Sequence, residues 1–115
     1  MLRTPKTIFH YSLFIFHSTM ITWILYDIEN DKARTKIAKH CKQSGLYRVQ
    51  LSCFLGELDA QMLDTLKLQI ESLINEDVDK VYIFPMNKGE LQQAVLMGQA
   101  FDKKMVTDEI KMLFL

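Results

Sequence analysis

Cysteine is scarce in this chain of 115 residues, which limits the kinds of site it can build. The two cysteines, Cys41 and Cys53, form no Cys-x-x-Cys pair and belong to no His and Cys cluster at zinc-ligand spacing. The pattern around Cys41 is helical, and Cys53 lies in a predicted strand. We therefore expect both to be reduced core residues of a cytoplasmic protein.

The chain also lacks net charge, because 14 basic residues balance 14 acidic ones. This balance argues against a globally basic nucleic-acid-binding protein. The charges are nevertheless segregated: residues 32–48 contain six Lys or Arg and no acid, whereas residues 59–79 contain six acids and one Lys. Two interpretations stay open, namely two ordinary solvated helix faces, or a basic side for phosphates with an acidic side away from it.

Long hydrophobic runs are missing as well. Residues 8–16 form an apolar, aromatic run, but polar residues interrupt it and it is too short to span a bilayer. Residues 17–19 make a poor signal-peptide cleavage site. We expect residues 1–19 to be an extension or an upstream start outside the fold, with a single domain over residues 20–115 and no membrane contact. A membrane anchor is the weaker alternative.

Residues 21–27 form the predicted strand around which the rest is organised. Its apolar side chains fall on both faces, as in Trp23 and Ile24, which is typical of a central strand covered on each side. The strand ends at Asp27. Because folds of this kind place ligands at the carboxyl end of a central strand, the Asp27 carboxylate is the first candidate for chemistry.

The remaining pattern predicts five further elements. A helix begins at Asn30 or Asp31 and ends before Gly45; a strand covers residues 46–54; residues 55–58 form a tight connection or a short strand; a helix follows Asp59; a strand covers residues 80–85. This order predicts an α+β, ferredoxin-like βαββαβ fold, with an antiparallel sheet and both helices on one face. The other face is then bare. The apolar C-terminal segment, residues 86–115, is predicted to pack at a homodimer interface.

Several short motifs, in order and at matching spacing, resemble the CRISPR-associated protein two family. They are Tyr26-Asp27-Ile28, Arg34, Gly45-Leu46, Arg48-Val49-Gln50, Ser52-Cys53-Phe54, Gly56-Glu57-Leu58 and Val81-Tyr82-Ile83-Phe84-Pro85. The resemblance covers residues 20–85 and continues more loosely to the end. It implies a cytoplasmic homodimer of ferredoxin-like subunits that acts in CRISPR adaptation, or spacer acquisition, by bridging an integrase partner and holding DNA.

The resemblance also implies residue roles. Some family members are described as magnesium-dependent endonucleases, which cleave single-stranded RNA or duplex DNA. Asp27 matches the family's metal-binding and catalytic position, so Mg²⁺ is the implied cofactor. Arg34, Lys36, Arg48 and Phe54 match its nucleic-acid-binding positions. A second arginine is commoner in the family where this chain has Lys36, which keeps the charge but loses bidentate phosphate geometry.

Three functions and two roles for Asp27 stay open. The functions are a metal-dependent endonuclease, a non-catalytic nucleic-acid-binding scaffold of the integrase complex, and a toxin-like ribonuclease on the same fold. The aromatic motif of an RNA recognition motif is absent from the sequence, which counts against a standard RNA-binding module of that type. One carboxylate per chain is a poor magnesium site, but two copies of Asp27 across a dimer twofold suit one ion. The alternative is that Asp27 is a turn residue that caps the first helix.

Overall fold

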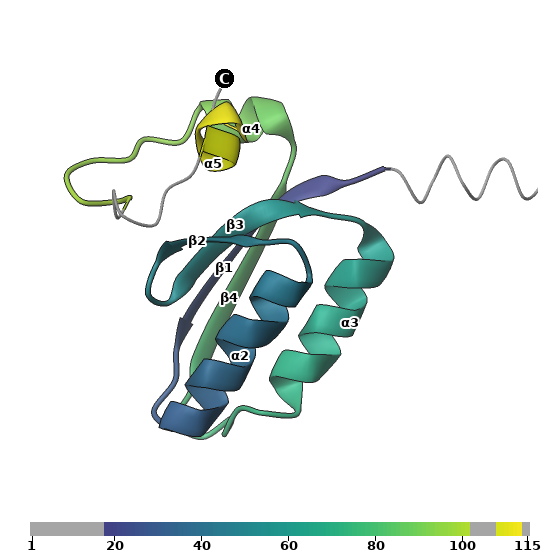
Figure 1. The fold of residues 1–115 in the computed structure, drawn as a ribbon, viewed down its shortest axis with the longest axis vertical. Coiled ribbons are helices and arrows are strands. Elements are labelled where there is room, and N and C mark those ends of the chain that lie inside the picture. The colour runs from purple at the N-terminus through teal and green to yellow at the C-terminus, as the bar shows by residue number, and fades with distance from the viewer. Residues whose placement is uncertain (1–17, 102–107, 114–115) are drawn as a thin grey trace, which may run out of the picture.

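The computed structural model describes residues 18–101 and 108–113 of the chain. The predicted ferredoxin-like α+β fold is confirmed: four strands form one antiparallel sheet in the order β2-β3-β1-β4. The elements are β1 (Met20–Asp27), α2 (Asp31–Gln43), β2 (Tyr47–Gln50), β3 (Cys53–Leu58), α3 (Ala60–Glu71), β4 (Lys80–Met86), α4 (Lys88–Gln92) and α5 (Asp108–Leu113). Helices α2 and α3 lie together on one face of the sheet (Figure 1).

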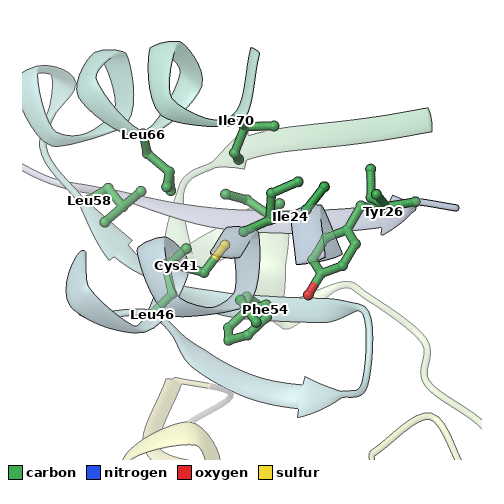
Figure 2. Packing of buried hydrophobic residues seen from close by; sticks show 12 residues of the cluster. Ile24, Tyr26, Cys41, Leu46, Phe54, Leu58, Leu66 and Ile70 are labelled. Atoms are coloured by element: carbon green, nitrogen blue, oxygen red, sulfur yellow. The ribbon is translucent and has the colours of Figure 1, made fainter. Parts of the chain in front are cut away.

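Strand β1 is central, as its two apolar faces predict. It pairs with β3 on one side and β4 on the other, so that Leu25 lies between Cys53 and Tyr82. Its even-numbered residues Ile24 and Tyr26 point to the side that α2 and α3 cover, and they are buried there with Phe54 (Figure 2). This cluster is the main hydrophobic core.

Side-chain caps start both long helices. Asn30 Oδ1 accepts a hydrogen bond from the backbone N–H of Ala33 at 2.9 Å, so Asn30 is the N-cap of α2. Asp59 Oδ1 accepts from the N–H of Met62 at 2.7 Å and caps α3, as predicted. Gly45 follows α2 with a φ of +95°, a left-handed conformation that glycine adopts without steric cost.

The predicted continuous strand over residues 46–54 is wrong. Residues 47–58 form a hairpin instead, in which β2 turns at Leu51 and Ser52 into β3. The alternation of apolar and polar residues runs straight through this turn, and no Gly, Pro, Asn or Asp marks it, so the pattern concealed it. Leu51, which the alternation groups with the apolar residues Val49 and Cys53, is 69% exposed at the tip.

The opposite face of the sheet is not bare along its whole length. Leu91 of α4 and Ile110 of α5 are buried against Ile21 and Leu55, in a second cluster near the start of β1. Figure 1 shows α4 and α5 at that end of the sheet. Further along the same face, exposed aromatic side chains remain at Tyr82 and Phe84, which are 48% and 49% exposed.

The predicted homodimer contact of the C-terminal segment stays a prediction. Residues 102–107 and 114–115 of that segment lie outside the described residues, as do residues 1–17 of the predicted extension. Within the described ranges, no helix is both long enough and apolar enough to cross a membrane.

Candidate functional site

A hollow of about 440 Å³ lies where β1 ends, α2 begins and β2 turns into β3. It is lined by Asp27, Ile28, Arg34, Thr35, Arg48, Leu51 and Ser52. We call this set of residues the β1-end hollow. Five residues were predicted to bind metal or nucleic acid. Three of them, Asp27, Arg34 and Arg48, come together in this hollow.

Asp27 is the last residue of β1, and its side chain is exposed. Its strand partner on β4 is Lys80. Within the described residues, 18–101 and 108–113, the Asp27 carboxylate forms no ion pair and no side-chain hydrogen bond. The N-cap of α2 is Asn30, three residues further on, so Asp27 is not the capping residue that the alternative interpretation made it.

Arg34 is partly exposed on the first turns of α2 and is held at two points. Its Nη1 donates to the carbonyl oxygen of Ile28 at 2.9 Å, and its Nη2 forms an ion pair with Asp31. The bond to Ile28 fixes the chain as it leaves β1. The partner Asp31 is strongly exposed, so this ion pair contributes little to stability and a phosphate can compete for the guanidinium.

Arg48 is half-buried on β2, on the same face of the sheet as α2. Its guanidinium carbon lies 5.1 Å from the centre of the Phe54 ring, within the range of a cation–π interaction. Its Nε is buried and has no hydrogen-bond partner among the residues that the structure describes. Arg48 therefore has an aromatic support under its guanidinium and also lines the β1-end hollow.

Two of the predicted nucleic-acid-binding residues do not line the hollow. Lys36 is exposed on α2, but it lies two residues after Arg34, which turns it about 200° around the helix axis. Phe54 is 0% exposed in the main core, so its ring is closed to a nucleic-acid base. The expected direct contact of Phe54 with nucleic acid does not fit this placement, because even-numbered residues of β3 point beneath α2.

The structure also brings in residues that sequence reasoning passed over. Tyr26 stacks on Phe54, with ring centres 6.3 Å apart, and its hydroxyl donates to the carbonyl oxygen of Leu51 at 3.4 Å. Burial raises the pKa of the Tyr26 phenol, and its hydrogen bond with Arg48 opposes that rise. The sequence did carry a signal for Tyr26: it directly precedes Asp27, and it shares the core face of β1 with Ile24.

One chain offers a magnesium ion a single strong ligand here. Asp27 provides the only carboxylate that lines the β1-end hollow as described. No group of three His, Cys, Asp or Glu side chains suited to a metal occurs in the described part of the chain. Mg²⁺ prefers oxygen ligands and keeps several waters, so Asp27 fits as one ligand of a hydrated or shared ion.

The lining groups suit a phosphodiester. Two arginines and one aspartate leave a formal charge of plus one in the hollow. Arginine presents planar, paired donors that match phosphate oxygens.

Comparison with known proteins shows the family of this chain. The family model described as "CRISPR associated protein Cas2" matches residues 20–94, from the start of β1 to just beyond α4. The chain belongs to the CRISPR-associated Cas2 family. The match contains the whole β1-end hollow, and it ends before α5, so the last described helix lies beyond the part that the family model covers.

Individual Cas2 proteins are similar at moderate identity. The CRISPR-associated endoribonuclease Cas2 1 of Archaeoglobus fulgidus is 36% identical over 67 residues, covering 58% of this chain and 71% of that protein. The CRISPR-associated endonuclease Cas2 of Halalkalibacterium halodurans is 37% identical over 70 residues, covering 56% and 72%. A crystal structure of cas2 superposes with a TM-score of 0.62 at 28% identity, covering 78% of this chain and 97% of that one.

Proposed function

We propose that this Cas2-family protein is a metal-dependent endonuclease of CRISPR adaptation. Its preferred substrate is single-stranded RNA, and duplex DNA is the second substrate class. The observation that carries the proposal is the meeting of Asp27, Arg34 and Arg48 in one open hollow, although they come from different elements. The names of the relatives, endoribonuclease and endonuclease, support the reaction class.

Each residue has a role in this proposal. Arg34 and Arg48 bind the phosphodiester and neutralise its charge, and the hollow is open enough to admit a backbone. Lys36, exposed further round α2, adds sequence-independent attraction for the same polyanion. Asp27 is the metal ligand. A Mg²⁺ ion held by Asp27 would supply a Lewis acid for the phosphate and a more acidic bound water for hydrolysis of the phosphodiester.

The proposal includes a homodimer. One carboxylate per chain is too few for a dedicated magnesium site, whereas two copies of Asp27 across a twofold axis supply two ligands. The exposed aromatic residues Tyr82 and Phe84, on the face opposite α2 and α3, are surface that a second subunit would cover. In the adaptation complex this dimer bridges the integrase partner.

A second function is favoured by one observation. The shortage of metal ligands in the described residues suits a scaffold that binds nucleic acid without cutting it. In that case the same arginines hold DNA for the integrase partner, and Asp27 has no chemical role. The two functions share the fold and the hollow, so only an activity measurement separates them.

The test is cleavage of labelled single-stranded RNA and duplex DNA, assayed side by side with Mg²⁺, with Mg²⁺ plus a chelator, and with Asp27→Asn. Asp64→Asn is the matched control, because it removes the same charge from an exposed position on α3. Light scattering reports the dimer. Cleavage that disappears with chelator and with Asp27→Asn, but survives Asp64→Asn, supports the endonuclease.

Two results contradict the endonuclease. Cleavage that persists in Asp27→Asn assigns the activity to another site or to a contaminant. An intact dimer that binds DNA and cleaves neither substrate is the scaffold. Binding should in either case weaken steeply as the salt concentration rises. Each phosphate contact steepens the slope of log affinity against log salt by about 0.7–0.9.

A further inference from the structure

Three side chains from three different strands form one contact cluster beneath the β1-end hollow. Tyr26 comes from β1, Arg48 from β2 and Phe54 from β3. The Tyr26 and Phe54 rings are stacked, with an angle of 16° between their planes, and the Arg48 guanidinium lies over Phe54. Figure 2 shows the Tyr26 ring extending from β1 towards Phe54.

Strand pairing explains why these residues meet. Arg48 and Phe54 are direct partners across β2 and β3, and Ile24 is the partner of Phe54 on β1. Tyr26 is therefore the diagonal neighbour of Phe54, at a separation that aromatic side chains can bridge. The register shifts between Arg48 and Gln50, which places a β-bulge directly after Arg48. Bulges occur next to functional sites, where they change the direction of a side chain.

The placement of Arg48 carries a cost that packing alone does not explain. Its Nε is buried without a hydrogen-bond partner in the described part of the chain. A buried donor left unpaired destabilises a fold, and an apolar side chain at this position avoids that penalty. A half-buried arginine kept at such a cost, with its guanidinium at the edge of the hollow, is better explained by ligand binding than by stability.

We propose that Tyr26 and Phe54 are positioning residues that hold the Arg48 guanidinium in place for a phosphodiester. Phe54 supports the flat face of the guanidinium, and Tyr26, fixed by its bond to the Leu51 carbonyl and stacked on Phe54, holds that ring in place. Neither residue needs to touch nucleic acid. This inference rests on the proposed binding of nucleic acid in the hollow.

The experiment is a double-mutant cycle on binding of labelled single-stranded RNA, measured by fluorescence anisotropy over a range of salt concentrations. Tyr26→Phe removes one hydroxyl and leaves the aromatic stack intact. We expect it to weaken binding about threefold to tenfold, the effect of losing the one ordinary hydrogen bond that fixes Tyr26 to the Leu51 carbonyl. In an Arg48→Gln background the same substitution should change binding less than twofold, because the group that it positions is gone.

Tyr47→Phe is the matched control, because it removes the same hydroxyl from an exposed tyrosine on β2 that does not line the β1-end hollow, and it should leave binding unchanged. Phe54→Leu is the second variant. It keeps an apolar side chain in the core but removes the π face under Arg48, and it should show the same dependence on Arg48. Thermal unfolding of every variant separates folding from binding, since a structural role would lower the melting temperature equally in both backgrounds.

Failures of the two proposals look different. Wild-type protein that does not bind RNA or DNA overturns the proposed function itself. Wild-type protein that binds and is weakened by Arg48→Gln, but not by Tyr26→Phe or Phe54→Leu, overturns the positioning role and leaves the function standing. Equal losses from Tyr26→Phe with and without Arg48 also overturn it, since Tyr26 would then act independently.

Discussion

The Arg48 guanidinium lies 5.1 Å from the centre of the Phe54 ring, and the two residues are direct partners across the β2–β3 pairing. One of the pair is fully buried and the other reaches the β1-end hollow. The pair thus joins the hydrophobic core to the candidate site. A change at Phe54 should be felt both in the free energy of unfolding and in the position of Arg48.

Phe54→Ala should destabilise the fold strongly. Truncating a fully buried phenylalanine removes its transfer free energy and leaves a cavity, which typically costs about 3–5 kcal/mol. Urea unfolding measures the loss. Leu68→Ala, on an exposed position of α3, is the control and should stay within about 0.5 kcal/mol. A small loss for Phe54→Ala would mean that its ring is at the surface, as direct contact with a base requires.

Asp31→Asn should strengthen nucleic-acid binding. The Asp31 carboxylate pairs with Arg34 at the β1-end hollow and competes with a phosphate for it. Since exposed pairs are worth about 0.2–1 kcal/mol, the affinity for single-stranded RNA should rise by a factor of up to about five, with the largest rise at low salt. The helix should lose about 0.3–1 kcal/mol, because Asp31 is a favourable charge in the first turn of α2.

Asp64→Asn is the matched control for this change in charge. Asp64 forms an exposed pair with Lys67 on α3, outside the hollow. An equal gain in affinity from both substitutions would show an effect of net charge alone and contradict the specific competition at Arg34.

Asp79→Asn should make the protein less stable at neutral pH. The Asp79 carboxylate accepts from the N–H of Asn75 at 2.8 Å and from the N–H of Glu29 at 2.9 Å, which joins the loop after α3 to the loop before α2. These two bonds, that of Asn75 first, hold the pKa of Asp79 below its ordinary value. The stabilisation is therefore present above an ordinary carboxyl pKa of about 3.9 and is lost as the pH falls through the lowered value.

Urea unfolding of wild type and Asp79→Asn over a series of acidic pH values measures this effect. The difference in stability should be largest near neutral pH and should shrink as Asp79 becomes protonated. Asp77→Asn, an exposed acid in the same loop, is the control. A difference that does not change with pH would contradict the assignment of the stabilisation to the ionised Asp79.

Both thiols should be unreactive in the folded protein. Burial raises the pKa of Cys41 to about 12 and the pKa of Cys53 to about 11, so very little thiolate forms at neutral pH. A coloured thiol reagent should label neither rapidly until urea is added, and half-buried Cys53 should react before fully buried Cys41. Rapid native labelling of Cys41 would show that the core between α2 and the sheet opens readily.

The same shifts predict a loss of stability in alkali. Because the folded state holds these thiol protons more tightly, the stabilisation is complete below an unfolded thiol pKa of about 8.5 and disappears as the pH rises towards the folded values. Urea unfolding between neutral and alkaline pH measures this trend. Replacement of Cys41 by Ala removes its titration and should flatten that part of the profile.

The sequence by itself determined the order of the elements and most of their ends. Apolar residues on both faces of residues 21–27 made β1 central, and Asp59 marked the start of α3. These signals act within a few residues, through hydrogen bonds to nearby backbone groups and through the period of the apolar pattern. The same local reasoning put Asp27 at the end of a central strand, where the structure places it.

Only the tertiary structure decided how the site is assembled. The turn at Leu51 and Ser52 carries no local turn signal, so the hairpin and its register depend on which strand pairs with β1. That register sets which way Phe54 points, and so places it in the core beneath Arg48. Asp27, Arg34 and Arg48 meet for the same reason. Contacts between residues distant in the chain arise from sheet pairing and helix packing, which local periodicity does not encode.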